Sequence, residues 1–251
     1  MSASSERGGR TITLGEAVEL SRGSPVISSG SAAIDSLLQG GYRGGELVEV
    51  YGESNTGKTQ LAMQAALSCA ARDSSVLYID TEGTFRPERI DAIARAKGLD
   101  GRELLRRVYR MRAADASSQI EASKLVHTKA ELAGCRMIVV DTVTKNFSVE
   151  YPGSKNLTHR QGLLSVYLSE LARDAFLMGM AVLLTNRVTS FRTPAGSREA
   201  HIGGETLSQM VHKSIHLMRE GGRGGGRILA SLTGWGGGLI AEGVISERGF
   251  S

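Results

Sequence analysis

The amino-acid sequence predicts a doubly wound α/β domain, with a mostly parallel sheet and antiparallel strands at its C-terminal edge. Short apolar runs alternate with helical stretches through the middle of the chain, which is the pattern of parallel strands buried on both faces. Three later strand-like runs follow one another with only glycine-rich turns between them, as antiparallel neighbours do. The 251 residues are enough for one such domain with a substantial core.

The central elements can be placed from the apolar runs and the stretches between them. The expected strands are 46–51, 75–80, 107–112, 136–141 and 181–186, and the expected helices begin at 59 and cover 87–96, about 115–132 and about 157–178. Crossovers between parallel strands of one sheet are almost always right-handed. The order of these elements therefore predicts a sheet with helices on both faces.

The two ends of the chain differ from this central pattern. Residues 1–24 are rich in Ser, Gly and Arg and predict a flexible arm, whereas residues 25–251 are assigned to the α/β domain. The expected antiparallel strands are 210–219, 227–233 and 238–246. Between the first two, GGRGGGR at 221–227 predicts a hairpin turn, with a phosphate-contacting loop as the alternative.

Composition places few limits on the partners of the protein. The net charge is +4 and the isoelectric point is about 9.2, which is compatible with a polyanionic partner without requiring one. Cys69 and Cys135 lie in apolar runs, so they are expected to be buried, reduced thiols of an intracellular protein. No apolar run is long enough to span a bilayer. We expect no membrane association and a cytoplasmic location, with nucleoid association if the source is prokaryotic.

The segment GESNTGKTQ at 52–60 is the strongest chemical signal. Gly52, Gly57, Lys58 and Thr59 satisfy the Walker A spacing G-x-x-x-x-G-K-[ST], and a strand precedes the segment and a helix follows it. Backbone N–H groups of such a loop converge on phosphate, the lysine reaches the β and γ phosphates, and the threonine hydroxyl binds Mg²⁺. The alternative is a glycine-rich turn that contains Lys-Thr by chance. The expected nucleotide-binding residues are Gly52, Glu53, Ser54, Asn55, Thr56, Gly57, Lys58, Thr59 and Gln60.

Two acidic residues complete the expected ATPase site. Asp141 closes the apolar run 136–141, and we expect this strand to lie directly beside strand 46–51 so that Asp141 and Thr59 hold the metal. Glu82 follows strand 75–80 and is the candidate for the carboxylate that activates water, with Lys58 as the second catalytic group. Asp80 is the rival to Glu82, although it lies nearer the strand and is suited to capping a turn.

These segments together resemble the RecA/RadA recombinase family, and most closely the ATPase core of archaeal RadA and its eukaryotic counterpart. The likeness runs from about Ile27 onward, and its motifs occur in the family's order: ISSGS at 27–31, GKTQ at 57–60, YIDTEGTFRPERI at 78–90, THRQG at 158–162, TNRV at 185–188 and IGG at 202–204. The resemblance implies a RecA-like P-loop NTPase core that uses ATP and Mg²⁺, Glu82 as general base, and Arg89 as a platform for adenine.

The resemblance also implies two DNA-binding loops, at about 147–160 and 187–203. Cations and an aromatic residue in such loops suit a single-stranded backbone and its bases, and solvated surface loops are the alternative. The candidate DNA-binding residues are Tyr151, Lys155, Arg160, Arg187, Arg192 and Arg198.

Four departures from the family pattern shape the expected function. Too few residues precede Ile27 for the helical N-terminal domain of complete recombinases, and TITL at 11–14 stands where they have Phe-x-x-Ala. Arg187 replaces the glutamine that senses the γ phosphate, and the segment 230–238 has no Asp-Pro cap. These features resemble RadA paralogs such as RadB.

We therefore expect a DNA-dependent ATPase that assists or regulates recombination and repair. Its expected partners are single-stranded DNA, a main recombinase of the RadA type, and further copies or relatives in a homo- or hetero-oligomer. The alternatives are a KaiC-like or adaptor ATPase that controls protein assembly, and a minimal strand-exchange recombinase.

Overall fold

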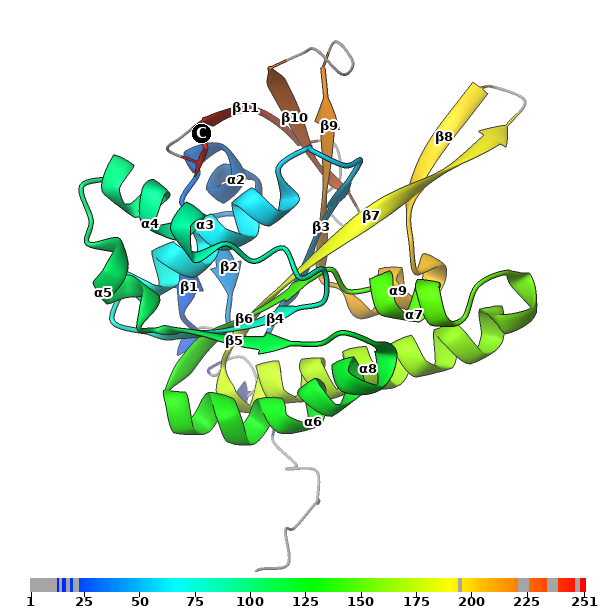
Figure 1. Ribbon diagram of the computed structural model, residues 1–251, viewed down its shortest axis with the longest axis horizontal. Helices are drawn as coiled ribbons and strands as arrows, with labels where there is room; N and C mark the ends of the chain where they lie inside the picture. Colours follow the sequence, from blue (N-terminus) through cyan, green and yellow to red (C-terminus); the bar gives the residue numbers. More distant parts are fainter. Residues whose placement is uncertain are drawn as a thin grey trace, which may run out of the picture.

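The computed structural model describes residues 13, 15–16, 19, 23–193, 196–220, 226–233, 239–246 and 249–251, with only the backbone described at 127, 129–132, 190–193 and 196–198. The predicted arm over residues 1–24 falls largely outside these ranges. In the described part, a ten-stranded sheet runs through the centre of the molecule, in the order β12-β11-β10-β9-β3-β7-β6-β4-β5 with β8 paired to β7 (Figure 1).

The parallel part of the sheet agrees with the predicted strands but not with their predicted order. Its members are β3 (Leu47–Gly52), β4 (Ser75–Asp80), β5 (Val108–Arg112), β6 (Cys135–Asp141), β7 (Ala181–Thr193) and β9 (Lys213–Arg219). The expectation that β6 lies directly beside β3 is wrong, because β7 lies between them. Residues 181–186 are all buried, and they belong to the strand that lies between β3 and β6.

Helices cover both faces of this sheet, as a doubly wound fold requires. On one face lie α2 (Ala32–Leu37), α3 (Lys58–Ala70), α4 (Pro87–Ala96) and α5 (Gly101–Leu105), and on the other lie α6 (Ala116–Ala133), α7 (Lys145–Glu150), α8 (Leu157–Met178) and α9 (Gly204–Met210) (Figure 1). Each set packs its own cluster of buried side chains against the sheet. The predicted fold class is therefore confirmed, including helices at 87–96 and 157–178.

Local sequence explains where several of these helices begin and end. Pro87 stands in the first turn of α4, where its missing N–H group is not needed. Asp100 caps α5, since its side chain accepts hydrogen bonds from the N–H groups of Arg102 and Glu103. Gly179 ends α8 with a φ of 62°, the left-handed conformation that favours glycine.

The C-terminal edge of the sheet is antiparallel, as the sequence predicts, but the expected strand 210–219 begins only at Lys213 and also pairs in parallel with β3. β10 (Arg227–Thr233) pairs antiparallel with β9 and with β11 (Ile240–Ser246), and the short β12 (Gly249–Phe250) closes this edge. Residues 221–225 of the predicted hairpin turn lie outside the described ranges. A separate two-stranded sheet, β1 (Val26–Ile27) with β2 (Tyr42–Arg43), precedes β3.

The two segments predicted to be DNA-binding loops are more ordered than loops. β7 continues to Thr193 and pairs antiparallel with β8 (Gly196–His201), so a β-hairpin projects from the sheet in place of the second loop (Figure 1). The first segment contains the end of α7, a 3-10 turn over Ser154–Asn156 and the start of α8. Both segments differ from the predicted loops for local reasons. In the second segment, the residues after 186 have strand-forming side chains, and in the first, the long helix α8 already begins at Leu157.

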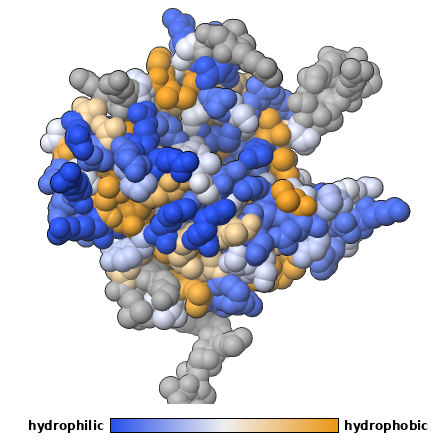
Figure 2. All heavy atoms as spheres, in the orientation of Figure 1, coloured by the Kyte–Doolittle hydropathy of each residue, from blue (hydrophilic) through white to orange (hydrophobic). Residues whose placement is uncertain are grey.

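The surface is mainly polar on the face that Figure 2 shows, with apolar side chains in separate groups. Among the described residues, no helix combines the length and the apolar character needed to cross a bilayer. Cys69 and Cys135 are both buried and unbridged. Burial raises the pKa of the Cys69 thiol to about 12 and that of Cys135 to about 11, so both stay protonated, as expected for inert thiols.

Candidate nucleotide-binding site

The loop at 53–57 joins the C-terminal end of β3 to the first turn of α3, which is the arrangement that a phosphate cradle requires. Gly57 has a φ of 93°, in the left-handed region, and a Cβ atom there would lie 2.6 Å from Cδ1 of Ile245. Only glycine fits this position without strain. Thr56 Oγ1 donates to the carbonyl oxygen of Glu53 (2.9 Å), which holds the loop closed on itself.

Lys58 lies across this loop. Its Nζ donates to the carbonyl oxygens of Gly52 (2.9 Å) and Glu53 (2.5 Å). Burial lowers the pKa of Lys58 to about 8, although the negative charge of Asp141 opposes this effect. A phosphate group would offset the cost of burying the ammonium charge better than neutral carbonyl oxygens do.

Thr59 and Asp141 come together as the sequence predicts, even though β7 separates their strands. Thr59 Oγ1 donates to Asp141 Oδ1 at 3.3 Å, and Tyr78 Oη donates to Asp141 Oδ2 at 2.9 Å. The Thr185 hydroxyl also donates to Asp141. Burial raises the pKa of Asp141 in spite of these three donors. A buried carboxylate beside a hydroxyl is a set of oxygen ligands that suits Mg²⁺.

Glu82 lies at the same edge of the sheet, with its side chain 14% exposed. Its Oε1 accepts hydrogen bonds from Thr142 Oγ1 (3.0 Å) and Arg187 Nη2 (2.7 Å), and Lys145 Nζ lies 3.7 Å from Oε2. The backbone N–H of Glu82 donates to the carbonyl oxygen of Asp141 at 3.3 Å. The structure therefore brings Glu82 near Thr59 and Asp141, the candidate metal ligands, and surrounds its carboxylate with donors.

Asp80, the rival to Glu82, has a structural role. It is fully buried, and Arg110 donates to its Oδ2 through Nη2 (2.6 Å) and Nε (3.0 Å). Its Oδ1 accepts from the N–H of Gly83 at 2.7 Å, which caps the turn after β4. With both oxygens engaged in this way, Asp80 is not placed to activate water.

Arg89 lies beside the first turn of α3. Its Nε donates to Gln60 Oε1 (2.7 Å), and its Nη2 donates to the carbonyl oxygen of Ser246 (2.8 Å) on β11. Strand β11 thus borders the candidate nucleotide site, through Ser246 and through Ile245 against Gly57. Sequence reasoning missed this contribution, and the only signal for it was the strand pattern near the end of the chain. It also missed Thr142 and Lys145, which directly follow the Asp141 strand.

Among the candidate DNA-binding residues whose side chains the structure describes, Arg160 and Arg187 contact different segments of the chain. Lys155 is exposed, whereas Arg160 lies on α8 and donates from Nη1 to the carbonyl oxygen of Tyr151 (2.6 Å). Arg187 points toward Glu82. The side chains of Arg192 and Arg198 lie outside the described part of the structure, so their predicted role is not addressed by the geometry.

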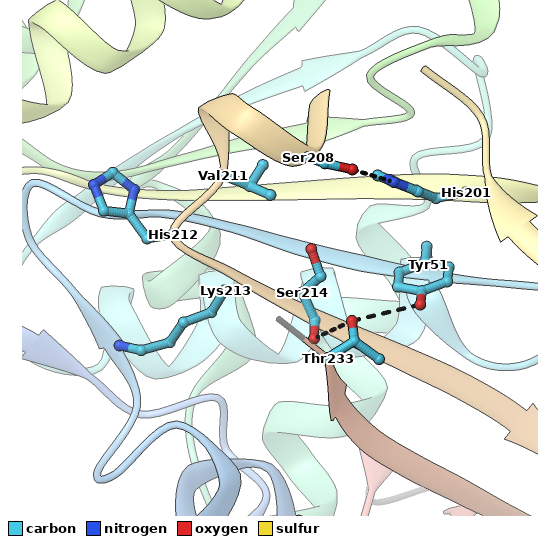
Figure 3. Close-up of a pocket in the computed structure, with 8 residues that line it drawn as sticks. All are labelled: Tyr51, His201, Ser208, Val211, His212, Lys213, Ser214 and Thr233. Atoms are coloured by element: carbon cyan, nitrogen blue, oxygen red, sulfur yellow. Dashed lines mark hydrogen bonds between the residues drawn. The ribbon is translucent and has the colours of Figure 1, made fainter. Parts of the chain in front are cut away.

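A second polar cluster joins the base of the β7–β8 hairpin to β3. Glu49 is fully buried on β3. Its Oε1 accepts from Asn186 Nδ2 (2.8 Å) and lies 2.9 Å from His201 Nδ1, and its Oε2 accepts from Ser214 Oγ (3.0 Å). His201 Nε2 is 2.8 Å from Ser208 Oγ (Figure 3). Burial lowers the pKa of His201, but the hydrogen bond and charge of Glu49 more than offset it and raise the pKa overall.

A small cavity of about 140 Å³ borders this cluster. In Figure 3, His212 and Lys213 point away from the hydroxyl and imidazole groups that line it. His212 Nδ1 accepts a hydrogen bond from the N–H of Leu47 (3.1 Å), and Lys213 pairs with Glu46 at 2.5 Å. Among the described residues, no group of three His, Cys, Asp or Glu side chains is arranged to hold a metal ion.

Comparison with known proteins agrees with this geometry. The model of the family described as Rad51 matches residues 24–233. The chain belongs to the Rad51 family. One relative, named DNA repair and recombination protein RadA, from Aeropyrum pernix, is 34% identical over 203 residues, which cover 78% of this chain and 64% of the relative. The chain thus spans less than two thirds of that relative's length. Membership of the Rad51 family confirms the predicted resemblance and the RecA-like fold class.

Proposed function

We propose that this Rad51-family chain is a Mg²⁺-dependent ATPase that binds single-stranded DNA and assists or regulates recombination and repair as a paralog of a main recombinase. The observation that carries the proposal is the meeting of four side chains at one edge of the sheet. Lys58 and Thr59 begin α3, Asp141 ends β6, and Glu82 follows β4. Ligands of open α/β sheets bind at this edge, outside the carboxyl ends of the strands.

Each of these residues has a separate task in the proposed hydrolysis. The N–H groups of residues 53–59 and the Lys58 ammonium bind the phosphates and offset their charge. Thr59 and Asp141 hold Mg²⁺, which supplies positive charge to the phosphates when it is bound. Glu82 orients the attacking water and accepts its proton. Arg89, next to Gln60 and Ser246, lies where the base of the nucleotide would leave the phosphate loop.

The proposed DNA-binding surface combines the segment after β6 with the β7–β8 hairpin. Both follow the C-terminal ends of neighbouring strands, so DNA bound there would lie on the same side of the sheet as the nucleotide. Lys155 is the exposed cation of the first segment. When such cations contact phosphates, the affinity for DNA falls as the salt concentration rises. For a single strand, each contact adds about −0.7 to the slope of the logarithm of the binding constant against the logarithm of the salt concentration.

An adaptor function that depends on nucleotide binding is the second candidate. It is favoured by the internal engagement of two groups that the first proposal uses, since Glu82 is paired with Arg187 and Arg160 donates to the Tyr151 carbonyl oxygen. A chain that kept these contacts in solution would bind ATP, turn it over very slowly and have little affinity for DNA.

The test is the rate of ATP hydrolysis with Mg²⁺, with and without single-stranded DNA. The first proposal expects DNA to raise the rate, Lys58→Ala to abolish it, and Glu82→Gln to keep ATP binding while lowering the rate by a factor of about 10² to 10⁴. Lys155→Ala should reduce the salt slope of DNA binding by about 0.7, and Lys124→Ala, an exposed lysine on α6, is the matched control.

ATP binding without DNA stimulation and without salt-sensitive DNA binding would instead support the adaptor. Homology-dependent strand invasion by the purified protein would identify a minimal strand-exchange recombinase. Absence of ATP binding would overturn both nucleotide-dependent proposals.

A further inference from the structure

A serine, a histidine and a glutamate form a continuous chain of hydrogen-bond distances at the base of the β7–β8 hairpin. Ser208 Oγ on α9 is 2.8 Å from His201 Nε2 at the end of β8 (Figure 3). His201 Nδ1 is in turn 2.9 Å from Glu49 Oε1 on β3. A nucleophile, its base and the acid that orients the base are recognised by this geometry and not by their order in the sequence.

The contacts of Glu49 determine which nitrogen of His201 carries the proton. Both carboxylate oxygens accept hydrogen bonds, Oε1 from Asn186 Nδ2 (2.8 Å) and Oε2 from Ser214 Oγ (3.0 Å). Because a carboxylate only accepts, the N–H of a neutral His201 ring lies at Nδ1, facing Glu49. Nε2 is then the acceptor of that ring, so the Ser208 hydroxyl donates to it. This is the arrangement in which a histidine removes a proton from a serine.

Exposure to water increases along the chain from the acid to the hydroxyl. Glu49 is fully buried, the His201 side chain is 16% exposed and Ser208 is exposed. Burial lowers the pKa of His201, but the hydrogen bond and charge of Glu49 raise it overall, which makes the ring a better proton acceptor. The only longer contact of the Ser208 hydroxyl given by the structure is to the carbonyl oxygen of Gly204, at 3.2 Å. The hydroxyl is therefore accessible, whereas the group that orients its base is protected from water.

The cavity beside the hydroxyl limits the size of the group that Ser208 can receive. Its volume is about 140 Å³, and Ser208, His201, Tyr51 and Thr233 are among the residues that line it. The ring centroids of Tyr51 and His201 are 5.4 Å apart, so Tyr51 packs beside the base. Pockets for drug-sized ligands have volumes of about 300 to 1,000 Å³. This smaller cavity fits a short acyl group.

We propose that Ser208 is a nucleophile, activated by His201 and Glu49, that short-chain activated esters acylate. Ser208 Oγ bonds to the carbonyl carbon of the ester while the hydroxyl proton moves to His201 Nε2. The bond from that carbon to the alkoxy oxygen breaks, and the leaving alcohol takes the proton from His201. Water then attacks the acyl group with His201 as its base, the carboxylic acid leaves, and the proton returns to Ser208 Oγ. This activity is separate from ATP hydrolysis and uses none of the residues assigned to it.

The first experiment treats the full chain with a short-chain alkyl fluorophosphonate, which forms a stable phosphonyl ester with an activated serine as fluoride leaves. Peptide mass spectrometry should find the label at Ser208 in the wild type. A positioned base contributes about 10²-fold to 10⁴-fold, so His201→Gln should lower the labelling rate by at least about 10²-fold. Ser169, an exposed serine of α8, is the matched control and should stay unlabelled.

A second variant covers the case in which His201→Gln is not folded, as judged by thermal unfolding. Ser208→Cys places a thiol beside the imidazole, which favours the reactive thiolate. Iodoacetamide should therefore alkylate Ser208→Cys at least about tenfold faster than Ser169→Cys. The native Cys69 and Cys135 are buried, so they contribute little to the measured rate.

Turnover is measured as hydrolysis of 4-nitrophenyl acetate. The wild type should be at least about tenfold faster than Ser208→Ala, whereas Ser169→Ala should equal the wild type. A chain of hydrogen bonds that only held the hairpin would leave Ser208 as unreactive as Ser169. Absence of label at Ser208, equal alkylation of Ser208→Cys and Ser169→Cys, or equal hydrolysis by wild type and Ser208→Ala would each overturn the proposal. None of these results depends on ATP, so they leave the proposed function as it stands.

Discussion

Replacement of Gln64 by leucine is expected to release the C-terminal strand from the phosphate-loop helix. Gln64 is fully buried on α3. Its Oε1 accepts from the N–H of Phe250 (2.7 Å), and its Nε2 donates to the carbonyl oxygens of Phe250 (3.0 Å) and Gly30. Leucine fills a similar volume but makes none of these hydrogen bonds, so the change isolates their contribution.

The expected loss of stability depends on whether each backbone group that loses Gln64 can find another hydrogen-bond partner. An unsatisfied buried N–H or C=O group costs about 1 to 3 kcal/mol. The carbonyl oxygen of Gly30 keeps Lys97 Nζ as a donor at 3.0 Å, so it adds little. The two Phe250 groups can reach water if β12 detaches, at the cost of exposing a ring that is 1% exposed, about 1.5 to 3 kcal/mol. We expect Gln64→Leu to lower the free energy of unfolding by about 2 to 3 kcal/mol.

The assay is urea unfolding of Gln64→Leu, Phe250→Ala and the double variant. Phe250→Ala alone should cost about 3 to 5 kcal/mol. Gln64→Leu removes the hydrogen bonds and Phe250→Ala removes the buried ring that hold β12 against α3. Because either change weakens the docking of the same strand, the double variant should cost at least about 1 kcal/mol less than the sum. Full additivity would refute the coupling. Gln209→Leu, on the exposed side of α9, is the control and should change stability by less than about 0.5 kcal/mol.

Two further outcomes are expected from charged groups outside the phosphate loop. Arg110→Ala leaves the buried Asp80 without its arginine and should lower the free energy of unfolding in urea by about 3 kcal/mol. The control Arg106→Ala, in an exposed pair, should lower it by less than about 1 kcal/mol. Similar losses in the two variants would contradict the structural role of Asp80. The pKa of His201 is raised beside Glu49, so the folded state binds the proton more tightly than the unfolded state does. Protonated His201 therefore stabilises the fold fully below about pH 6.5, and this stabilisation is lost as the pH rises through the folded pKa. His201→Gln should flatten the fall of stability above that pH, and an unchanged slope would exclude His201 as its source.

The phosphate loop and the helices beside it are predictable because their signals are local. Gly57 is required by a left-handed backbone, and Pro87 marks the first turn of α4. The hairpin after residue 186 also had a local signal that the loop interpretation overlooked. Val188, Thr189 and Phe191 are strand-forming residues, and they continue β7 beyond the buried part of the sheet.

Contacts between distant segments were not predictable, because they depend on the order of the strands. Four of the five predicted strands, 46–51, 75–80, 136–141 and 181–186, are short and mainly apolar, and nothing within these four indicates which of them are neighbours in the sheet. The contact of Phe250 with Gln64 depends on the path of the last strands around α2 and α3. Hydrogen bonds of this kind join residues far apart in the sequence, so only the folded chain shows them.

The position of β7 between β3 and β6 determines which residues Arg187 contacts. If β6 lay directly beside β3, the residue that follows the buried part of β7 would stand at the far side of Asp141, away from the phosphate loop. With β7 between the two strands, that residue is instead paired with Gly52 and reaches Glu82. Arg187 therefore lies beside the phosphate loop and the candidate base at the same time. Nδ2 of the neighbouring Asn186 donates hydrogen bonds to Glu49 and to the carbonyl oxygen of Ile202. The same strand therefore connects the candidate site to the base of the β7–β8 hairpin.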